Sequence, residues 1–299
     1  MVFVQLIGVL ILLHFLLKVY SFFGKKKARL LVPSEEEKEE ESNPEAKATM
    51  LGIFKESLVN PPQELKSPAS VNSATKPKLP HDILNHFISS NPTSAFYMSF
   101  GMDALFAYSP STPNRMFCGL DDIYCTFLGS LNNLSSLIKQ YGLSKGTNEA
   151  MFIIEAYRTL RDRGPYPADQ VLKELEGNFG FVIYDHKEKA LFAALGSNEQ
   201  IGLFWGFAAD GSVVISEDLD LIKASCAKSY APFPTGCLFH SDHGLRSFEH
   251  PRMKMKAMPR IDSEGIMCGA NFNVDSQSRV PMMPRVGSEA NWAAWGSQA

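Results

Sequence analysis

Runs of apolar residues separated by short polar breaks predict a β-hairpin near the middle of the chain, within residues 175–206 (LEGNFGFVIYDHKEKALFAALGSNEQIGLFWG). Residues 179–185 form an aromatic and β-branched run that is typical of a buried strand. A polar turn at residues 186–189 separates this run from a second apolar run at residues 190–195. We expect both strands to lie in the core, and the other elements are placed relative to them.

Similar patterns predict further strands on both sides of this hairpin. Strand-rich blocks at residues 95–108 and 115–129 are broken by Gly101 and by the polar segment SPSTPN. Asp210-Gly211 lies between two apolar runs and predicts a two-residue hairpin turn, because these residues adopt positive φ angles at low cost. The remaining predicted strands lie at residues 50–54, 237–240 and 265–274.

Helical periodicity appears between the strands. Residues 147–160 carry apolar side chains at helical spacing, with Thr147 as the predicted N-cap and Glu149 in the first turn. Gly142 is a typical residue for the C-terminal end of the preceding helix. The other predicted helices lie at residues 80–89, 133–141 and 219–225, with a short helix beginning near residue 167. Antiparallel strands with helices grouped between them indicate an α+β layered domain.

Composition divides the chain into four parts. Residues 1–24 are almost entirely apolar and residues 25–49 are charged, and we expect residues 50–275 to form the folded domain and residues 276–299 a loose tail. The stretch EEEKEEES and the scarcity of apolar residues around it predict a disordered acidic linker in the second part.

The apolar segment predicts an N-terminal helix that anchors the chain in a membrane. About 20 apolar residues span a bilayer core, and residues 2–23 satisfy this length. Basic residues follow directly, from Lys25 to Arg29, and keep the domain after them in the cytosol under the positive-inside rule. The alternative is an extension that is absent from the working protein, which then lies in the cytoplasm or nucleus.

Composition and charge argue against some partner classes. A net charge of −3 offers no basic face for nucleic acid. The 299 residues include 45% apolar and 20% charged side chains, as in an ordinary globular protein. The five cysteines have no CxxC spacing, which argues against a disulfide framework or a structural zinc site and fits a reducing compartment.

Seven segments together resemble the glutamine-amidotransferase domain of asparagine synthetases, which belongs to the N-terminal-nucleophile hydrolases. MLGIF at residues 50–54 is similar to that family's MCGIF, FLGSLNNLSSL at residues 127–137 to its NGEIYN segment, and GTNE at residues 146–149 to its SDxE turn. LEGNFGFVIYD, GLFWG, ISE with KA, and FPTG resemble LxGxFAFVIYD, PLYYG, SExKAL and FPPG. Their shared order over residues 50–240 carries the resemblance, because no single segment is specific.

The plant family of aluminium-induced proteins, which is named for YGL and LRDR motifs, resembles the chain more closely. DDIYCTFLGSLNNL, RGPYP and FPTG also fit that family, and the resemblance covers residues 50 to about 275. The two naming motifs occur here as Tyr141, Gly142 and Leu143, and as Leu160, Arg161, Asp162 and Arg163. The resemblance implies a four-layer αββα sandwich of the N-terminal-nucleophile hydrolase kind. It also implies a role in plant responses to stress, including aluminium, and to hormones.

The resemblance to glutamine amidotransferases further implies which residue would be the nucleophile, and this chain has no nucleophilic side chain at that position. An N-terminal-nucleophile enzyme uses the side chain of its first residue as nucleophile and its free α-amino group as base. The cysteine of MCGIF corresponds to Leu51, which has no nucleophilic atom. Met50 cannot replace it, because a thioether has no proton to lose, and 49 residues precede Met50 in this sequence.

Other positions of the implied glutamine pocket are also altered. The asparagine of the oxyanion hole corresponds to Leu128, so only Gly129 offers a backbone N–H. Loss of one such donor costs about 10²–10³ in rate. The aspartate that binds the substrate amino group corresponds to Asn148, next to Glu149. We therefore expect no glutaminase activity and no catalytic residues.

One arginine has two interpretations. Arg163-Gly164-Pro165 resembles the family's HRGP, whose arginine binds the substrate carboxylate, but it follows the long helix instead of preceding the NGEIYN-like segment. We interpret Arg161, Asp162 and Arg163 as a charge cluster that complements the helix dipole. A specific anion site there is the alternative.

The sequence contains no motif for a metal or a cofactor. His240, His243 and His250 fall around a glycine-containing loop without a cysteine pair, so we expect surface histidines. The sequence has no phosphate-binding loop and no GxGxxG after a strand. Cys118 and Cys125 bracket a turn and are expected to be buried thiols, with a redox pair as the alternative.

The leading hypothesis is a non-catalytic amidotransferase-like domain that binds a small metabolite in the former glutamine pocket or a protein partner. One alternative is an amidohydrolase that uses Cys118 or Cys125 as a relocated nucleophile. Another is an adaptor tethered to a membrane through residues 2–23. Because one fold hosts many functions, each alternative needs its own experiment.

Overall fold

The computed structural model describes residues 50–68, 76–92, 94–110, 114–162, 168–261, 265 and 267–279. The chain forms two units, Met1–Asn43 and Pro44–Ala299, and every described residue belongs to the second unit. The predicted apolar helix at residues 1–24 and the predicted acidic linker at residues 25–49 lie outside the described residues. The fold is therefore built from Met50 onward.

A six-stranded antiparallel sheet, here called the first sheet, has the predicted first strand near its centre. Its strands are β1 (Met50–Phe54), β2 (Phe96–Phe100), β3 (Ala104–Tyr108), β8 (Phe204–Phe207), β9 (Val213–Ser216) and β10 (Tyr230–Pro232). Their order across the sheet is β10-β8-β9-β1-β3-β2. Leu51 of β1 pairs with Ala107 on one side and with Ser216 on the other.

A second antiparallel sheet contains the central hairpin. Its strands are β4 (Arg115–Leu120), β5 (Ile123–Leu131), β6 (Gly177–Asp185), β7 (Ala190–Leu195), β11 (Cys237–His240) and β12 (Gly244–Ser247). Their order is β12-β11-β7-β6-β5-β4, so the hairpin β6–β7 occupies the middle of the sheet. Asp185 at the end of β6 pairs with Ala190 at the start of β7. The predicted hairpin is confirmed.

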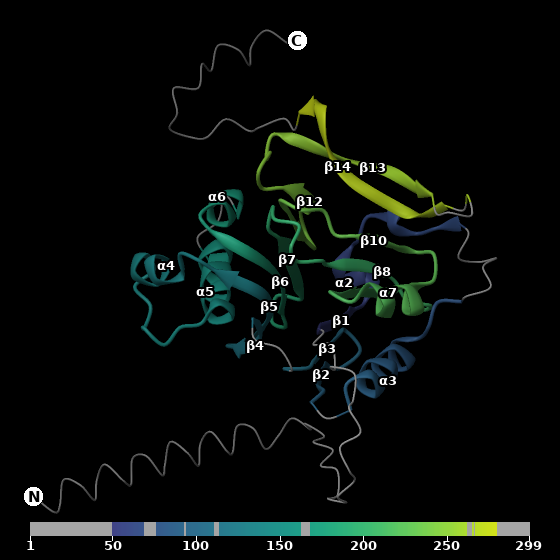
Figure 1. The fold of residues 1–299 in the computed structure, drawn as a ribbon, viewed down its shortest axis with the longest axis horizontal. Coiled ribbons are helices and arrows are strands. Elements are labelled where there is room, and N and C mark those ends of the chain that lie inside the picture. The colour runs from purple at the N-terminus through teal and green to yellow at the C-terminus, as the bar shows by residue number, and fades with distance from the viewer. Residues whose placement is uncertain are drawn as a thin grey trace, which may run out of the picture. The chain divides into compact units, whose positions relative to one another are not determined.

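Most of the described helices lie on the outer faces of the two sheets, and α2 (Glu56–Val59) packs instead against the cluster between them. The other helices are α3 (Pro80–Ser90), α4 (Leu134–Gln140), α5 (Glu149–Asp162), α6 (Ala168–Lys173) and α7 (Leu219–Cys226), with a 3₁₀ turn η1 (Gln63–Leu65). Apolar side chains of α4, α5 and α6 pack on the second sheet, and those of α3 and α7 pack on the first. Figure 1 shows these two groups of helices on opposite sides of the strands. The predicted mixture of helices with large antiparallel sheets is confirmed.

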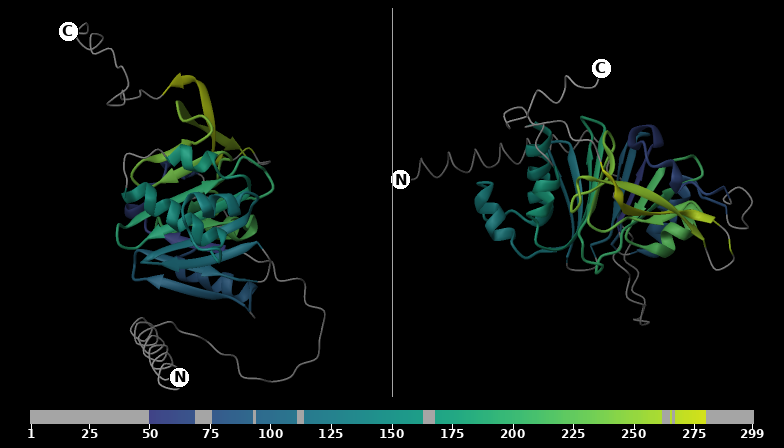
Figure 2. Two further views of the ribbon diagram at one scale, coloured as in Figure 1. Left: turned by 90° about the vertical axis from the view of Figure 1, so that its left-hand side faces the viewer. Right: turned by 90° about the horizontal axis from the view of Figure 1, so that it is seen from above.

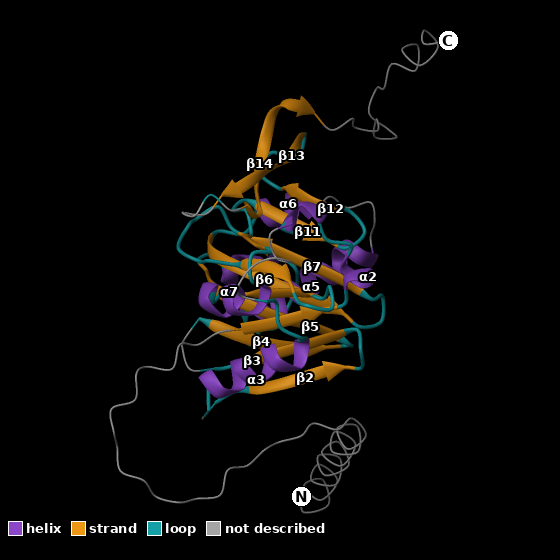
Figure 3. Cartoon of the chain, turned by 90° about the vertical axis from the view of Figure 1, so that its right-hand side faces the viewer, coloured by secondary structure: helices purple, strands orange, loops and turns teal. Residues whose placement is uncertain are grey.

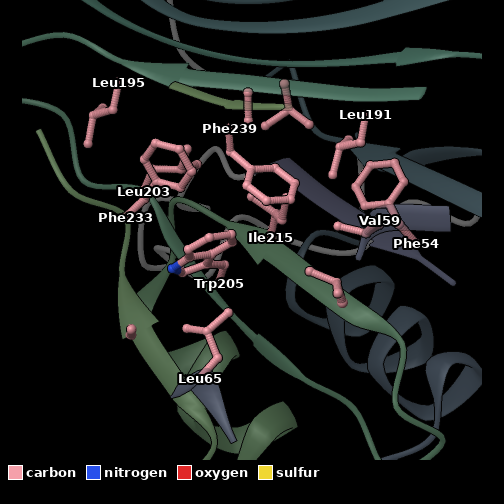
Figure 4. Packing of buried hydrophobic residues seen from close by; sticks show 14 of the residues in the cluster. Phe54, Val59, Leu65, Leu191, Leu195, Leu203, Trp205, Ile215, Phe233 and Phe239 are labelled. Carbon is pink, nitrogen blue, oxygen red and sulfur yellow. The ribbon is translucent and has the colours of Figure 1, made fainter. Parts of the chain in front are cut away.

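The largest apolar cluster fills the space between the two sheets. Trp205, Phe54 and Phe239 are almost completely buried there and come from both sheets (Figure 4). Burial of each such side chain stabilises the fold by roughly 1.5–3 kcal/mol. Alternation along β1 divides its side chains between this cluster and the helices, because successive residues of a strand face opposite sides. Met50 and Phe54 face the other sheet, whereas Leu51 faces α3 and α7.

The C-terminal part of the fold is a two-stranded ribbon, β13 (Met253–Ile261) and β14 (Met267–Arg279), drawn in yellow-green in Figure 2. Only the second of these strands is predicted from the sequence, at residues 265–274. Arg260 fixes the ribbon against β10, because its guanidinium stacks 4.2 Å from the ring centre of Tyr230 and donates 2.8 Å to the Tyr230 carbonyl. The ribbon therefore lies along one edge of the first sheet.

The predicted two-residue turn at Asp210-Gly211 is wrong in detail. The backbone N–H of Ala208 donates to the Ser212 carbonyl, so the loop between β8 and β9 is longer. Gly211 has a φ of +85°, as expected for this turn. The Asp210 carboxylate instead accepts a hydrogen bond from the Ser212 N–H at 3.0 Å, a side-chain turn that competes with the shorter hairpin.

Candidate functional site

Leu51 lies where the amidotransferase resemblance places a nucleophile. Its side chain is completely buried and packs with Ile83 and Phe87 of α3 and Leu221 of α7. This position is therefore part of the apolar layer between the first sheet and its helices. Neither the hydrocarbon side chain nor its surroundings can support nucleophilic chemistry.

Gly129 in β5 is the implied oxyanion donor, and its N–H is already bound. It donates to the Asn114 carbonyl at 2.8 Å. Gly129 has a φ of +95°, and a Cβ at this position would overlap the backbone carbonyl oxygen of Asn178. The neighbouring Leu128, at the position of the oxyanion asparagine, is fully buried between the sheets. The Gly129 N–H is therefore bound within the chain, and Leu128 belongs to the apolar core.

An ion pair lies beside these positions and joins the two sheets. Arg115 Nε in β4 lies 2.6 Å from Glu217 Oε2, which follows β9, and the Glu217 side chain is only 7% exposed. The Tyr108 hydroxyl donates to the Arg115 carbonyl. Burial, the largest effect, raises the pKa of Tyr108. Cross-strand pairing sets Met50 opposite Tyr108 and Arg115 opposite Leu128.

Sequence reasoning did not identify this ion pair as part of the site. Glu217 belongs to the segment that resembles SExKAL, so the resemblance could have identified it as a site residue. Arg115 stands after a polar loop and matches no motif, so nothing in the sequence indicated its partner. Arg115 and Glu217 are 102 positions apart, and the fold brings them together at the start of β4 and the end of β9.

Asn148, the implied partner of a substrate amino group, caps a helix. Its side-chain oxygen accepts a hydrogen bond from the Met151 N–H at 2.9 Å at the start of α5. The predicted cap Thr147 is therefore wrong by one residue, whereas Glu149 lies in the first turn as predicted. Asn148 is exposed over the second sheet, while Leu51 is buried under the helices of the first sheet. The cap hydrogen bond accounts for an asparagine at this position.

The YGL motif connects α4 to α5. The Tyr141 ring contacts the Phe152 ring of α5 with centres 5.1 Å apart. Gly142 has a φ of +68° and follows the helix end, as predicted. The Leu143 N–H donates to the Ile138 carbonyl at 2.9 Å. This motif is a helix-termination signal that also packs against the next helix.

The LRDR motif ends α5 and reaches the central hairpin. Leu160 packs against the core of the second sheet. Arg161 Nη1 lies 2.9 Å from Oδ2 of Asp185, the fully buried last residue of β6, and Arg161 Nε lies 2.8 Å from Asp162 Oδ1. Arg161 donates both hydrogen bonds, and they raise its pKa, the bond to Asp162 having the largest effect. Arg163, which the alternative of an anion site involves, lies outside the described residues.

The Asp185 carboxylate therefore connects the end of α5 to the turn of the central hairpin. Its other oxygen, Oδ1, accepts hydrogen bonds from the N–H groups of Lys187 and Glu188 in the hairpin turn. The Tyr157 hydroxyl donates to Oδ2 at 3.3 Å, and burial, followed by the Asp185 charge, raises the pKa of Tyr157. The helix-dipole interpretation of Arg161 missed this contact.

Cys118 and Cys125, the proposed relocated nucleophiles, are cross-strand partners in the β4–β5 hairpin. Cys125 is fully buried and Cys118 is half-buried, and both side chains face the helices over the second sheet. Burial raises the pKa of both thiols, that of Cys125 most strongly. A thiol with a raised pKa is a poor nucleophile at neutral pH, because the thiolate is the reactive form.

Two of the three histidines considered for a metal lie close together at the end of β11. His240 Nδ1 is 3.4 Å from His243 Nδ1 and accepts a hydrogen bond from the Asp242 N–H at 3.1 Å. Burial, followed by the charge of His243, lowers the pKa of His240. Across the described ranges, no group of three or more His, Cys, Asp or Glu side chains is arranged to hold a metal ion.

None of the helices in the described part of the chain is long and apolar enough to cross a membrane. The predicted anchor at residues 2–23 lies outside that part.

A family model described as aluminium induced protein matches residues 51–274. The stem-specific protein TSJT1 of Nicotiana tabacum is 41% identical over 149 residues, which cover 48% of this chain and 99% of that protein. A probable glutamine-hydrolysing asparagine synthetase of Dictyostelium discoideum is 36% identical over 73 residues. That match covers 24% of this chain and 13% of the synthetase.

A solved structure with a similar chain trace is the glutamine phosphoribosylpyrophosphate amidotransferase of B. subtilis in complex with ADP and GMP. It has a TM-score of 0.39 and 14% sequence identity, and the match covers 69% of this chain and 50% of that chain. A glutamine aminotransferase class-II domain protein from silicibacter pomeroyi has a TM-score of 0.35 and 10% identity, over 66% of this chain and 88% of that chain.

Proposed function

The chain belongs to the aluminium-induced protein family, and from this premise we propose that it is a non-catalytic glutamine-amidotransferase-like domain that acts by binding. The proposal includes the finer fold assignment, a four-layer αββα sandwich of the N-terminal-nucleophile hydrolase kind. Two packed antiparallel sheets with helices on their outer faces support this assignment. Partial sequence identity to asparagine synthetases supports it as well.

The hydrogen bond from Gly129 to Asn114 is the observation that carries the proposal. An oxyanion hole needs N–H groups that point at an open position 2.7–3.1 Å away. Here a carbonyl oxygen of the chain lies at that distance from the Gly129 N–H, 2.8 Å. An oxyanion cannot take this position without displacing the Asn114 carbonyl oxygen. The remaining donor of the implied pocket is thus occupied in the folded protein.

The residues considered as nucleophiles also support a non-catalytic domain. Leu51 has no reactive atom and is covered by α3 and α7. Cys118 and Cys125 have pKa values raised by burial. Neither observation favours the amidohydrolase alternative, because nucleophilic catalysis needs a lowered pKa or an adjacent base.

The binding part of the proposal rests on the polar groups that remain at this end of the sheets. Arg115 is partly exposed and carries a planar guanidinium that suits carboxylates. Its partner Glu217 supplies the opposite charge. We propose that a small polar metabolite or a protein surface binds here, in a regulatory role connected with the aluminium response that names the family.

Covalent labelling tests the non-catalytic part directly. The full-length protein is incubated with an electrophilic glutamine analogue, and intact-mass spectrometry measures adducts. We expect no adduct, whereas a glutamine-hydrolysing amidotransferase of the cysteine type serves as the labelled control. A stoichiometric adduct that peptide mapping places on Cys118 or Cys125 would instead establish the amidohydrolase alternative.

A further inference from the structure

Strand β2 forms an exposed edge of the first sheet. Among the described residues it pairs with β3 alone. Four of its five residues, FYMSF, are exposed, and these include Phe96, Tyr97 and Met98. Met102, in the turn that follows, is 90% exposed. Figure 3 shows β2 at the end of the succession of strands.

The other sheet edges are protected in ways that β2 is not. Strand β10 contains Pro232 and lies against β14, and β12 lies beside β13. Strand β4 begins with Arg115, whose charge is paired with Glu217. In contrast, β2 has no charged residue and no proline. Monomeric proteins commonly use such residues to prevent pairing at an edge, so an unprotected edge indicates a strand partner.

We propose that β2 pairs antiparallel with β2 of a second copy of this chain, across a two-fold axis at Met98. This register sets Tyr97 opposite Ser99 of the second copy and Phe96 opposite Phe100 of the second copy. A two-fold axis normal to the sheet keeps each side chain on its own face, so on the face of Phe96, Met98 and Phe100 apolar side chains meet apolar side chains. The unpaired backbone groups of the edge then form ladder hydrogen bonds.

Aromatic packing behind the edge favours a second copy. The Phe96 ring contacts the Tyr108 ring at 5.2 Å and the Phe117 ring at 6.0 Å. These contacts link the edge of the first sheet to β4 of the second. Pairing across the axis joins the two aromatic groups through Phe96 and Met98, which lie on the same face of β2.

The charges around β2 are also compatible with self-pairing. The nearest acidic group in the β2–β3 turn is Asp103, and its carboxylate is paired with Lys189 at 2.6 Å. The strand itself is neutral, so the two paired strands carry no like charges. A strongly charged peptide partner would find no complementary charge on the strand. A second copy is therefore the occupant that fits.

Disulfide crosslinking tests the axis in the full-length protein. The variant Met98→Cys places two thiols opposite each other across the axis, and mild oxidation should convert most of the protein to a reducible dimer on a non-reducing gel. Met258→Cys, at an exposed methionine of β13, is the matched control and should form no crosslink, so it runs as a monomer on the same gel. Equal crosslinking of the two variants, or none at Met98→Cys, overturns the proposal.

Light scattering gives an independent measurement in a non-ionic detergent, which keeps residues 2–23 from causing association. The wild-type chain should have twice the monomer mass of 33.2 kDa. Met98→Lys and Met98→Glu should each be monomeric, because like charges then meet at the axis, and their equimolar mixture should regain the dimer mass. Met258→Lys should remain dimeric. A monomeric wild-type protein at tens of micromolar, or dimeric single-charge variants, contradicts the pairing.

Discussion

Arg161, in the LRDR motif, binds the completely buried carboxylate of Asp185 at the end of β6, with Nη1 and Oδ2 2.9 Å apart. The contact joins the end of α5 to the turn of the central hairpin. The same carboxylate holds the turn through the N–H groups of Lys187 and Glu188. The family motif and the amidotransferase-like strand are therefore two halves of one structural unit.

Removing this arginine should destabilise the fold. In Arg161→Ala the buried Asp185 carboxylate loses its cationic partner. Breaking a fully buried pair costs about 3–5 kcal/mol, and partial exposure of the guanidinium, 28%, reduces this to roughly 2–3 kcal/mol. The free energy of unfolding in urea, followed by circular dichroism, measures the change.

Arg158 provides the control for that experiment. It lies on the same helix and pairs with Glu155 and Asp121, which are both more exposed than Asp185. Arg158→Ala should cost less than about 1 kcal/mol, as surface pairs do. If both variants lose the same stability, Asp185 has no special role.

Gly129 should tolerate no side chain. Gly129→Ala combines a positive φ with an overlap between the new Cβ and the Asn178 carbonyl, so we expect a loss of more than about 2 kcal/mol. Gly142→Ala is the matched control, because Gly142 also has a positive φ but no atom within 4 Å of the new Cβ. It should lose only about 1 kcal/mol from backbone strain. Urea unfolding distinguishes the two values, and equal losses would show that space at Gly129 is not limiting.

His240 should make the fold sensitive to acid. Burial lowers the pKa of His240 in the folded state. As the pH falls below about 6.5, the unfolded chain takes up a proton that the folded chain does not, so the free energy of unfolding decreases until the folded pKa is passed. His240→Asn should therefore lose less stability between about pH 7 and about pH 5.5 than the wild type.

The comparison needs a histidine variant that keeps the wild-type response. His81 is 69% exposed on its side chain, and His81→Asn should show the same loss of stability in acid as the wild type. An unchanged acid response in His240→Asn would assign the effect to other groups.

The apolar segment at residues 2–23 predicts membrane association of the full-length chain. After fractionation of cells, the chain should sediment with membranes and resist extraction at alkaline pH. A chain that lacks residues 1–24 should appear in the supernatant. Complete recovery of the full-length chain in the supernatant would rule out the tethered-adaptor alternative.

The strands and helices were largely predictable, because their apolar periodicity is local. The central hairpin, the paired strands on either side of it and helix α5 follow from patterns of a few residues. The family was predictable from its two short motifs, and the match over residues 51–274 confirms it. Alternating methionine and lysine with Pro259 concealed β13, since half of its residues face solvent.

The long-range contacts of the candidate site and of the LRDR motif could not be predicted. Gly129 and Asn114 meet through a backbone hydrogen bond, which carries no residue-type signal. Arg161 and Asp185 are separated by 24 positions and come from a helix end and a strand end. Their partnership depends on how α5 lies across the second sheet, and that packing is not encoded in a local pattern.

A glutamine-hydrolysis assay tests the central claim, that the chain has no amidotransferase chemistry, most directly. Glutamate release is measured with the full-length protein and with a chain that begins at Met50, beside a glutamine-hydrolysing asparagine synthetase. The closed position at Gly129 and the hydrocarbon at Leu51 predict no release above the buffer background for either chain. Sustained turnover that a single Cys118→Ser or Cys125→Ser substitution abolishes would contradict the account.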